Sequence, residues 1–109
     1  MDSIITNWSK AKVRRIELRL DVERKSYDKA LKILRKELPK LDFISGNTVV
    51  DVLENGYRTD FYSKTQMGSI SINIWTDSSV FWAKLRFTLD HIDKLMTKNK
   101  IVYYNLVKE

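Results

Sequence analysis

Two groups of acidic side chains in the sequence could do chemistry. Asp51 and Asp60 would face each other across a β-hairpin, and paired carboxylates can serve acid/base or metal chemistry because each opposes the ionisation of the other. Asp90, His91 and Asp93 lie within one helical turn. A metal ion needs further ligands from elsewhere in the fold, and the chain has no second histidine. A one-residue change of register would separate Asp51 from Asp60, so we expect ordinary surface residues in both groups.

Other catalytic motifs are absent from the sequence. It contains no cysteine, which excludes a catalytic thiol, a disulfide framework and a thiolate metal site. It has three glycines and no glycine-rich phosphate loop. We therefore expect no catalytic residue, no metal and no cofactor, and a protein that binds rather than catalyses.

A row of lysines is the strongest electrostatic feature. Lys25, Lys29, Lys32, Lys36 and Lys40 recur at spacings of three and four, which places them on one face of a helix. The chain carries a formal net charge of +6, and such a row can contact a phosphate backbone. The predicted nucleic-acid contacts are Lys29, Lys32 and Lys36. The same spacing is also typical of the solvated face of an amphipathic helix.

These lysines require a helix that follows a strand. Residues 15–22 alternate strictly between apolar and charged, which predicts a half-buried β-strand. Ser26 can cap a helix, and apolar residues at helical spacing predict that this helix runs from Tyr27 to Leu38. Pro39 should end it, because proline disfavours helical geometry in the preceding residue.

The middle of the chain predicts a hairpin and a second clear strand. Residues 48–53 and 57–63 are rich in β-forming residues and flank Asn55-Gly56, a pair that suits a tight hairpin turn. From Gly68 onward the pattern alternates again. Its inward residues are Ile70, Ile72 and Ile74.

The remaining segments are ambiguous from periodicity alone. Residues 80–89 alternate as in a strand, but their helical stripe continues further, to Met96. Asp77, Ser78 or Ser79 can cap such a helix, so we favour a helix there. Residues 101–107 fit a final strand, although helical spacing could also continue through them.

These elements predict a single domain over residues 1–109, with residues 1–11 as a flexible amino-terminal extension. The expected fold is an α+β two-layer sandwich, with two helices on one face of an antiparallel sheet, ferredoxin-like or KH-like. No segment approaches the roughly 18 apolar residues that a membrane span needs, and no signal peptide is evident. We expect a cytoplasmic protein.

The order of elements, together with one short motif, resembles the Pcc-type small subunit of the KEOPS complex, which makes transfer-RNA threonylcarbamoyl-adenosine. The motif is Thr76-Asp77-Ser78-Ser79 directly after an alternating strand, followed by apolar residues at the positions of the family's second helix. Where the family usually has Arg and Asn-Ser, this chain has Trp82 and Arg86-Phe87. The chain thus resembles a divergent member or paralogue.

The resemblance implies a non-catalytic accessory subunit. It implies a homodimer, or a heterodimer with a related Pcc-type subunit, that binds the threonylcarbamoyl transferase catalytic subunit and contacts tRNA. The implied protein interface comprises Phe81, Trp82, Leu85 and Leu89. Two alternatives remain open: an unrelated protein-binding module, such as a viral or mobile-element protein that acts on a host complex, and a stand-alone nucleic-acid-binding protein.

Overall fold

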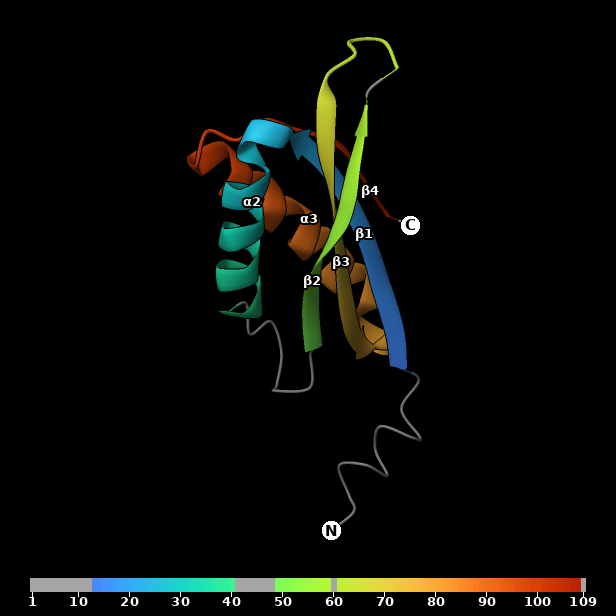
Figure 1. The fold of residues 1–109 in the computed structure, drawn as a ribbon. Coiled ribbons are helices and arrows are strands. Elements are labelled where there is room, and N and C mark those ends of the chain that lie inside the picture. Colours follow the sequence, from blue (N-terminus) through green and yellow to red (C-terminus); the bar gives the residue numbers. More distant parts are fainter. Residues whose placement is uncertain (1–12, 41–48, 60, 109) are drawn as a thin grey trace.

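A computed structural model describes residues 13–40, 49–59 and 61–108. The chain alternates strands and helices in the order βαββαβ, with a short 3-10 turn before one helix and another after the other (Figure 1). The elements are β1 (Val13–Glu23), α2 (Arg24–Glu37), η1 (Leu38–Lys40), β2 (Val49–Thr59), β3 (Gln66–Asp77), η2 (Ser78–Val80), α3 (Phe81–Lys98) and β4 (Tyr103–Lys108).

The four strands form one antiparallel sheet in the order β2-β3-β1-β4. Both helices lie on the same face of this sheet, so the molecule has two layers (Figure 1). This arrangement is the ferredoxin-like two-layer sandwich, and it confirms the predicted α+β fold. No helix of the described residues lies on the opposite face of the sheet, and we call it the open face.

The core lies between the helices and the sheet. On β1 and β3 the inward residues are at most 1% exposed, as the alternating patterns predict: Ile16, Leu18, Leu20, Val22, Ile70, Ile72 and Ile74. Each strand residue points to the face opposite its neighbour, so one apolar set meets the helices. The central strands were therefore predictable from local pattern.

Helix α2 begins earlier than predicted. It starts at Arg24, its capping residue Glu23 makes no side-chain cap bond, and the predicted cap Ser26 lies inside the first turn. Tyr27 packs its ring directly over Gly68, where any side chain would overlap the ring. Its hydroxyl donates to the Ser69 carbonyl at 3.1 Å. This contact, which local sequence does not reveal, ties the helix to β3.

The predicted hairpin turn at Asn55-Gly56 is wrong. Strand β2 runs straight through this pair and forms its hairpin with β3 instead. The register between β2 and β3 shifts by one residue between Glu54 and Tyr57, so the pair forms a β-bulge, and Gly56 takes the positive φ of 87° there. A glycine that tolerates positive φ suits a bulge as well as a turn.

The carboxyl-terminal third resolves both ambiguities. Residues 81–98 are helical, as favoured, and the final strand spans Tyr103–Lys108. Asn99 ends α3, because its side-chain amide donates to the Leu95 carbonyl at 2.8 Å. None of the helices in the described part of the chain is long and apolar enough to span a membrane. The predicted extension, residues 1–11, lies outside the described residues.

Candidate functional site

The predicted cap before α3 forms one turn early: Asp77 caps η2, and Val80, at the start of α3, makes no side-chain cap bond. The Asp77 carboxylate accepts a hydrogen bond from the backbone N–H of Ser79 at 2.9 Å. This bond, reinforced by the Ser79 side chain, lowers the pKa of Asp77 below its usual value. The motif therefore begins η2, and η2 leads directly into α3 at Phe81.

The four predicted interface residues divide between core and surface. Phe81 is 1% exposed and Leu85 is 7% exposed, so both belong mainly to the protein's own core. Trp82 is 64% exposed, and Leu89 is half-buried. A shallow hollow of about 390 Å³ on α3 is lined by Trp82, Leu85, Arg86, Leu89 and Asp90.

Arg14 on β1 lies against the two aromatic residues at the start of α3. The guanidinium of Arg14 lies 3.8 Å from the ring centroid of Phe81 and 5.6 Å from that of Trp82. The two rings meet edge to face at 5.1 Å. Such cation–π and aromatic contacts orient exposed rings. Trp82 is thus an oriented aromatic side chain beside a hollow, the usual form of an anchor at a protein interface.

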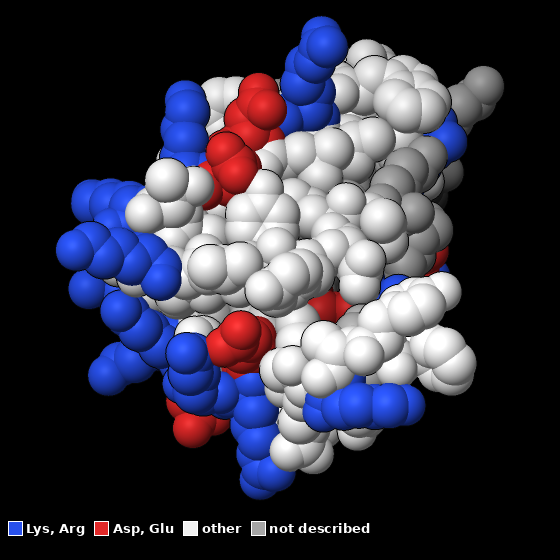
Figure 2. Space-filling view, turned by 90° about the horizontal axis from the view of Figure 1, so that it is seen from above, with Lys and Arg blue, Asp and Glu red and all other residues white. Residues whose placement is uncertain are grey.

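The predicted nucleic-acid contacts share one exposed surface on α2. Lys29, Lys32 and Lys36 are all exposed. Lys29 Nζ donates to the Asn99 carbonyl at 3.2 Å, while Lys32 and Lys36 form no ion pair with the residues that the structure describes. In Figure 2, which looks down on the molecule, Lys and Arg crowd the left side, where α2 lies in Figure 1.

The acidic residues singled out from the sequence show no metal-binding arrangement among the residues that the structure describes. Asp51 lies opposite Asn73 on β3, and Asp60 lies outside the described residues. On α3 the His91 ring stacks on Phe87 with centroids 6.0 Å apart. Within residues 13–40, 49–59 and 61–108, no three His, Asp or Glu residues are placed to hold a metal ion.

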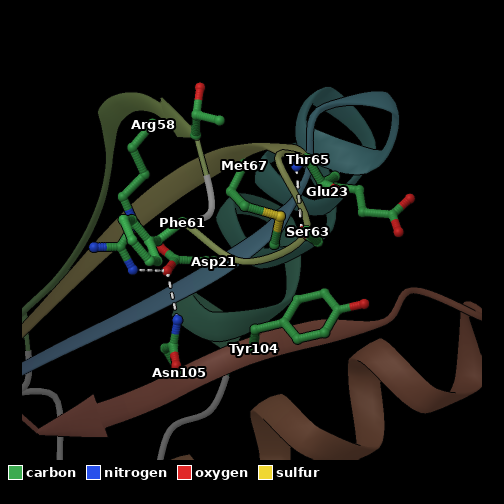
Figure 3. Close-up of a pocket in the computed structure, with 10 residues that line it drawn as sticks. Asp21, Glu23, Arg58, Phe61, Ser63, Thr65, Met67, Tyr104 and Asn105 are labelled. Carbon is green, nitrogen blue, oxygen red and sulfur yellow. Dashed lines mark hydrogen bonds and ion pairs between the residues drawn. The ribbon is translucent and has the colours of Figure 1, made fainter.

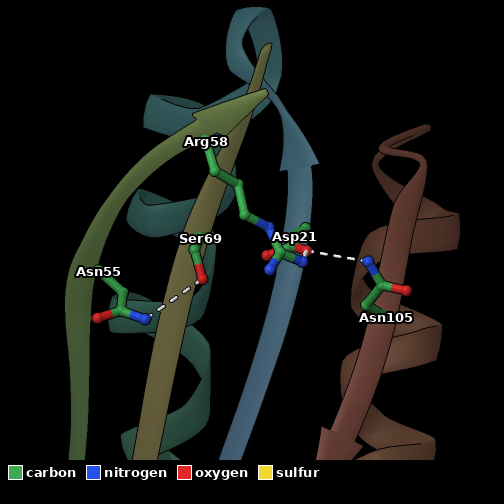
Figure 4. Close-up of polar contacts among 5 residues, drawn as sticks. All are labelled: Asp21, Asn55, Arg58, Ser69 and Asn105. Carbon is green, nitrogen blue, oxygen red and sulfur yellow. Dashed lines mark hydrogen bonds and ion pairs between the residues drawn. The ribbon is translucent and has the colours of Figure 1, made fainter. Parts of the chain in front are cut away.

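The open face holds a polar cluster that sequence reasoning did not identify. Asp21 on β1 pairs with Ser69 on β3, and these residues are only 1% and 5% exposed. Arg58 forms an ion pair with Oδ2 of Asp21, and Asn105 Nδ2 donates to the same oxygen at 3.0 Å (Figure 4). Asn55 donates to the Ser69 hydroxyl at 3.4 Å. Side chains from both edge strands, β2 and β4, therefore reach two polar residues on the central strands.

Bulges in the two edge strands, β2 and β4, direct Asn55 and Asn105 toward the central strands. Asn55 lies in the bulge of β2, next to Gly56. On β4 the pairing with β1 shifts register beside Asp21, and Asn105 adopts a positive φ of 54° there. A non-glycine residue in this conformation costs energy, and bulges often redirect a side chain toward a functional site. The cluster is therefore built from irregular backbone on either side of regular strands.

A pocket of about 560 Å³ adjoins this cluster (Figure 3). It lies at the end of the sheet where β1 and β2 finish and β3 and β4 begin. Its lining combines charged, hydroxyl, amide and aromatic side chains: Asp21, Glu23, Arg58, Thr59, Phe61, Ser63, Thr65, Met67, Tyr104 and Asn105. This volume falls within the usual range for small-molecule sites.

The sequence offered only a weak signal for the pocket. Asp21 occupies an outward position of an alternating strand, as do Arg15, Glu17 and Arg19, which are exposed or half-buried. Nothing local marks Asp21 for burial. Asn55-Gly56 was a signal for irregular backbone, but it indicated a turn just as well as a bulge. The cluster depends on residues up to 84 positions apart.

No protein-family model and no curated protein matches the chain. Among solved structures, part of a protein assigned as an aminohydrolase from methicillin resistant Staphylococcus aureus superposes with a TM-score of 0.55 and 8% identity, over 91% of this chain. This chain spans 29% of that protein. The de novo designed protein Foldit4 superposes with a TM-score of 0.50 and 17% identity, over 89% of this chain and 94% of the design. At these identities the likeness concerns the fold alone.

Proposed function

We propose that the protein is a non-catalytic accessory subunit of a KEOPS-like complex for tRNA threonylcarbamoyl-adenosine modification. It acts in the cytoplasm, pairs with a second copy or a related Pcc-type subunit, binds the catalytic transferase subunit and contacts tRNA. The observation that carries the proposal is the surface of α3. There the capped motif Thr76–Ser79 leads directly into a helix with a large exposed aromatic residue.

The surface of α3 supports a protein contact. Trp82 is 64% exposed, and a hollow is lined by Trp82 and Leu89. Large aromatic residues beside a hollow are over-represented among the residues that dominate binding energy. Because Phe81 and Leu85 are buried in the core, the area offered to the transferase comes from Trp82 and Leu89, which line the hollow.

The proposal is tested by measuring binding between this protein and the purified transferase subunit from the same cells. Trp82→Ala should weaken binding about 30-fold, since loss of an interface anchor costs about 2 kcal/mol. Val102→Ala, which truncates a residue that is 62% exposed outside α3, is the control and should bind like the wild type. Absence of binding between the wild-type protein and the transferase subunit would overturn the proposal.

The lysines of α2 support contact with tRNA. Lys32 and Lys36 have no ionic partner within the described residues, so they can pair with phosphates. Replacing Lys29, Lys32 and Lys36 with alanine should reduce the log-log slope of tRNA affinity against salt by about two to three, because each phosphate contact releases counterions. Lys→Arg at the same positions keeps the charges and should keep the slope. An unchanged slope in the alanine variant would remove α2 from the RNA surface.

A further inference from the structure

The carboxylate of Asp21 is incompletely satisfied. Its side chain is 1% exposed, and its Oδ2 accepts from both Arg58 and Asn105. Its Oδ1 is buried and has no hydrogen-bond partner among the residues that the structure describes. A buried acceptor without a donor costs about 1–3 kcal/mol, so native structures normally supply one. A ligand in the adjoining pocket can supply that donor.

The charges of the pocket do not favour an ion. The two acidic residues in its lining are both paired: Asp21 with Arg58, and Glu23 with Lys25, whose Nζ lies 3.3 Å from the carboxylate. No unbalanced negative charge remains to hold a cation. A phosphate inside the pocket would meet two carboxylates. The lining therefore suits a neutral group that both donates and accepts hydrogen bonds.

The aromatic residues of the pocket favour a planar group. Tyr104 and Phe61 are 43% and 75% exposed, and in Figure 3 their rings come from different segments around Asp21. Rings exposed in this way offer faces on which a flat heterocycle can stack. We propose that this pocket binds a nucleobase that carries an exocyclic amine, namely adenine, cytosine or guanine.

The recognition follows from the donors and acceptors of the pocket. The exocyclic amine of the base donates to Oδ1 of Asp21, as amines of bases do to carboxylates elsewhere. N–H groups of Arg58 or Asn105 donate to an acceptor on the base, and Tyr104 stacks on its face. Arg58 is 45% exposed, so its side chain can shift enough to admit the base beside Oδ1 while it stays paired with Oδ2. Uracil would place a carbonyl oxygen where the amine should be, opposite the carboxylate.

This inference does not depend on the proposed function, since the pocket lies on the open face and not on α3. The base could belong to a free nucleotide or to single-stranded RNA. Both sources present the same chemistry. In RNA, sequence-specific recognition commonly uses unstacked bases that stack on aromatic side chains and bond along their edges.

The experiment titrates the isotope-labelled full-length protein, without any partner, with AMP, CMP, GMP and UMP. Separate titrations use single-stranded oligoadenylate and oligouridylate. Backbone amide signals of Asp21, Tyr104 and Asn105 should shift with the amine-bearing nucleotides or with oligoadenylate. Affinity for the uridine ligands should be at least tenfold weaker. Shifts with mononucleotides identify a free nucleotide as the source, and shifts with oligoadenylate alone identify RNA.

Two variants and one control test the assignment of the pocket. Tyr104→Ala should weaken binding about tenfold or more through loss of stacking. Asp21→Asn preserves the shape of the side chain and should remove the preference over uridine. Val49→Ala truncates a residue that is 54% exposed at the other end of β2 and does not line the pocket, so it should bind like the wild type.

Three results would overturn the proposal. One is the absence of shifts at Asp21, Tyr104 and Asn105 with every nucleotide and oligonucleotide at millimolar concentration. Another is equal affinity for adenosine and uridine ligands. The third is displacement of bound nucleotide by a small cation such as agmatine, which would assign the pocket to amines instead.

Discussion

The two faces of the same sheet are built by different rules. On β1, Leu18 and Leu20 face the helices, are at most 1% exposed and belong to the hydrophobic core. One position further along, Asp21 faces the other way and is equally buried, but under polar side chains from β2 and β4. The face that packs against the helices, which we call the covered face, results from alternation along each strand. The polar cluster results from bulges that bring distant residues together.

The two faces of the sheet contribute differently to the stability of the protein. The covered face removes apolar area from water, which provides the main driving force for folding. The polar cluster contributes less net stability, because a buried charge loses hydration that its partners only partly replace. The polar cluster is therefore expected to matter less for folding than the core, in line with the binding role that we propose for the adjoining pocket.

The largest expected effect is on the covered face. Leu20→Ala should lower the free energy of unfolding by about 2–5 kcal/mol, since it removes buried methyl groups and leaves a cavity. Glu17→Ala on the open face of the same strand is the control. It removes an exposed ion pair with Arg15 and should cost less than about 1 kcal/mol. Urea unfolding of both variants measures the difference, and similar losses would contradict the contrast between the faces.

An intermediate loss of unfolding free energy is expected in the polar cluster, and it should differ between the two partners of the ion pair. Arg58→Ala leaves the buried carboxylate of Asp21 with Asn105 as its remaining partner and should cost about 1–3 kcal/mol. Asp21→Asn removes the buried charge and leaves Arg58 able to reach water, so it should cost less. Urea unfolding of the two variants gives the order. A larger loss for Asp21→Asn than for Arg58→Ala would mean that the carboxylate stabilises the fold.

The smallest effect concerns the link between β4 and α3, at the edge of the covered face. The Tyr103 hydroxyl donates to Asp93, and this bond raises the pKa of Tyr103 from 10.0 to about 12. The unfolded chain therefore loses this proton first, so the contribution to stability is complete below about pH 10 and is lost as the pH rises through about 12.

Tyr103→Phe removes this dependence on pH. At neutral pH the variant should lose less than about 1.5 kcal/mol, the net contribution of one hydrogen bond. Its unfolding free energy should fall less steeply than that of the wild type above about pH 10. Unfolding measured across alkaline pH tests this, and parallel curves for the two proteins would show that the bond to Asp93 does not form in solution.

Local pattern predicted the parts of the fold that depend on neighbours in sequence. The strands of Ile16 to Val22 and Ile70 to Ile74, the cap at Asp77 and the end of α2 before Pro39 all follow from spacing or from single-residue geometry. The same reasoning failed at Ser26 and at Asn55-Gly56. Ser26 lies inside α2 and not at its cap. Asn55-Gly56, which suits both a turn and a bulge, forms a bulge because β2 pairs with β3 on either side of it.

The sequence by itself determined the two central strands, their apolar faces and the basic face of α2, because side-chain direction repeats along a strand or helix with a set period. Only the tertiary structure decided that β2 continues through Asn55-Gly56, since a bulge exists only relative to the strand that pairs with it. It also decided that Asp21 is buried while Glu17 is not. That difference arises from Arg58 and Asn105, which reach Asp21 from strands 37 and 84 residues away in the chain.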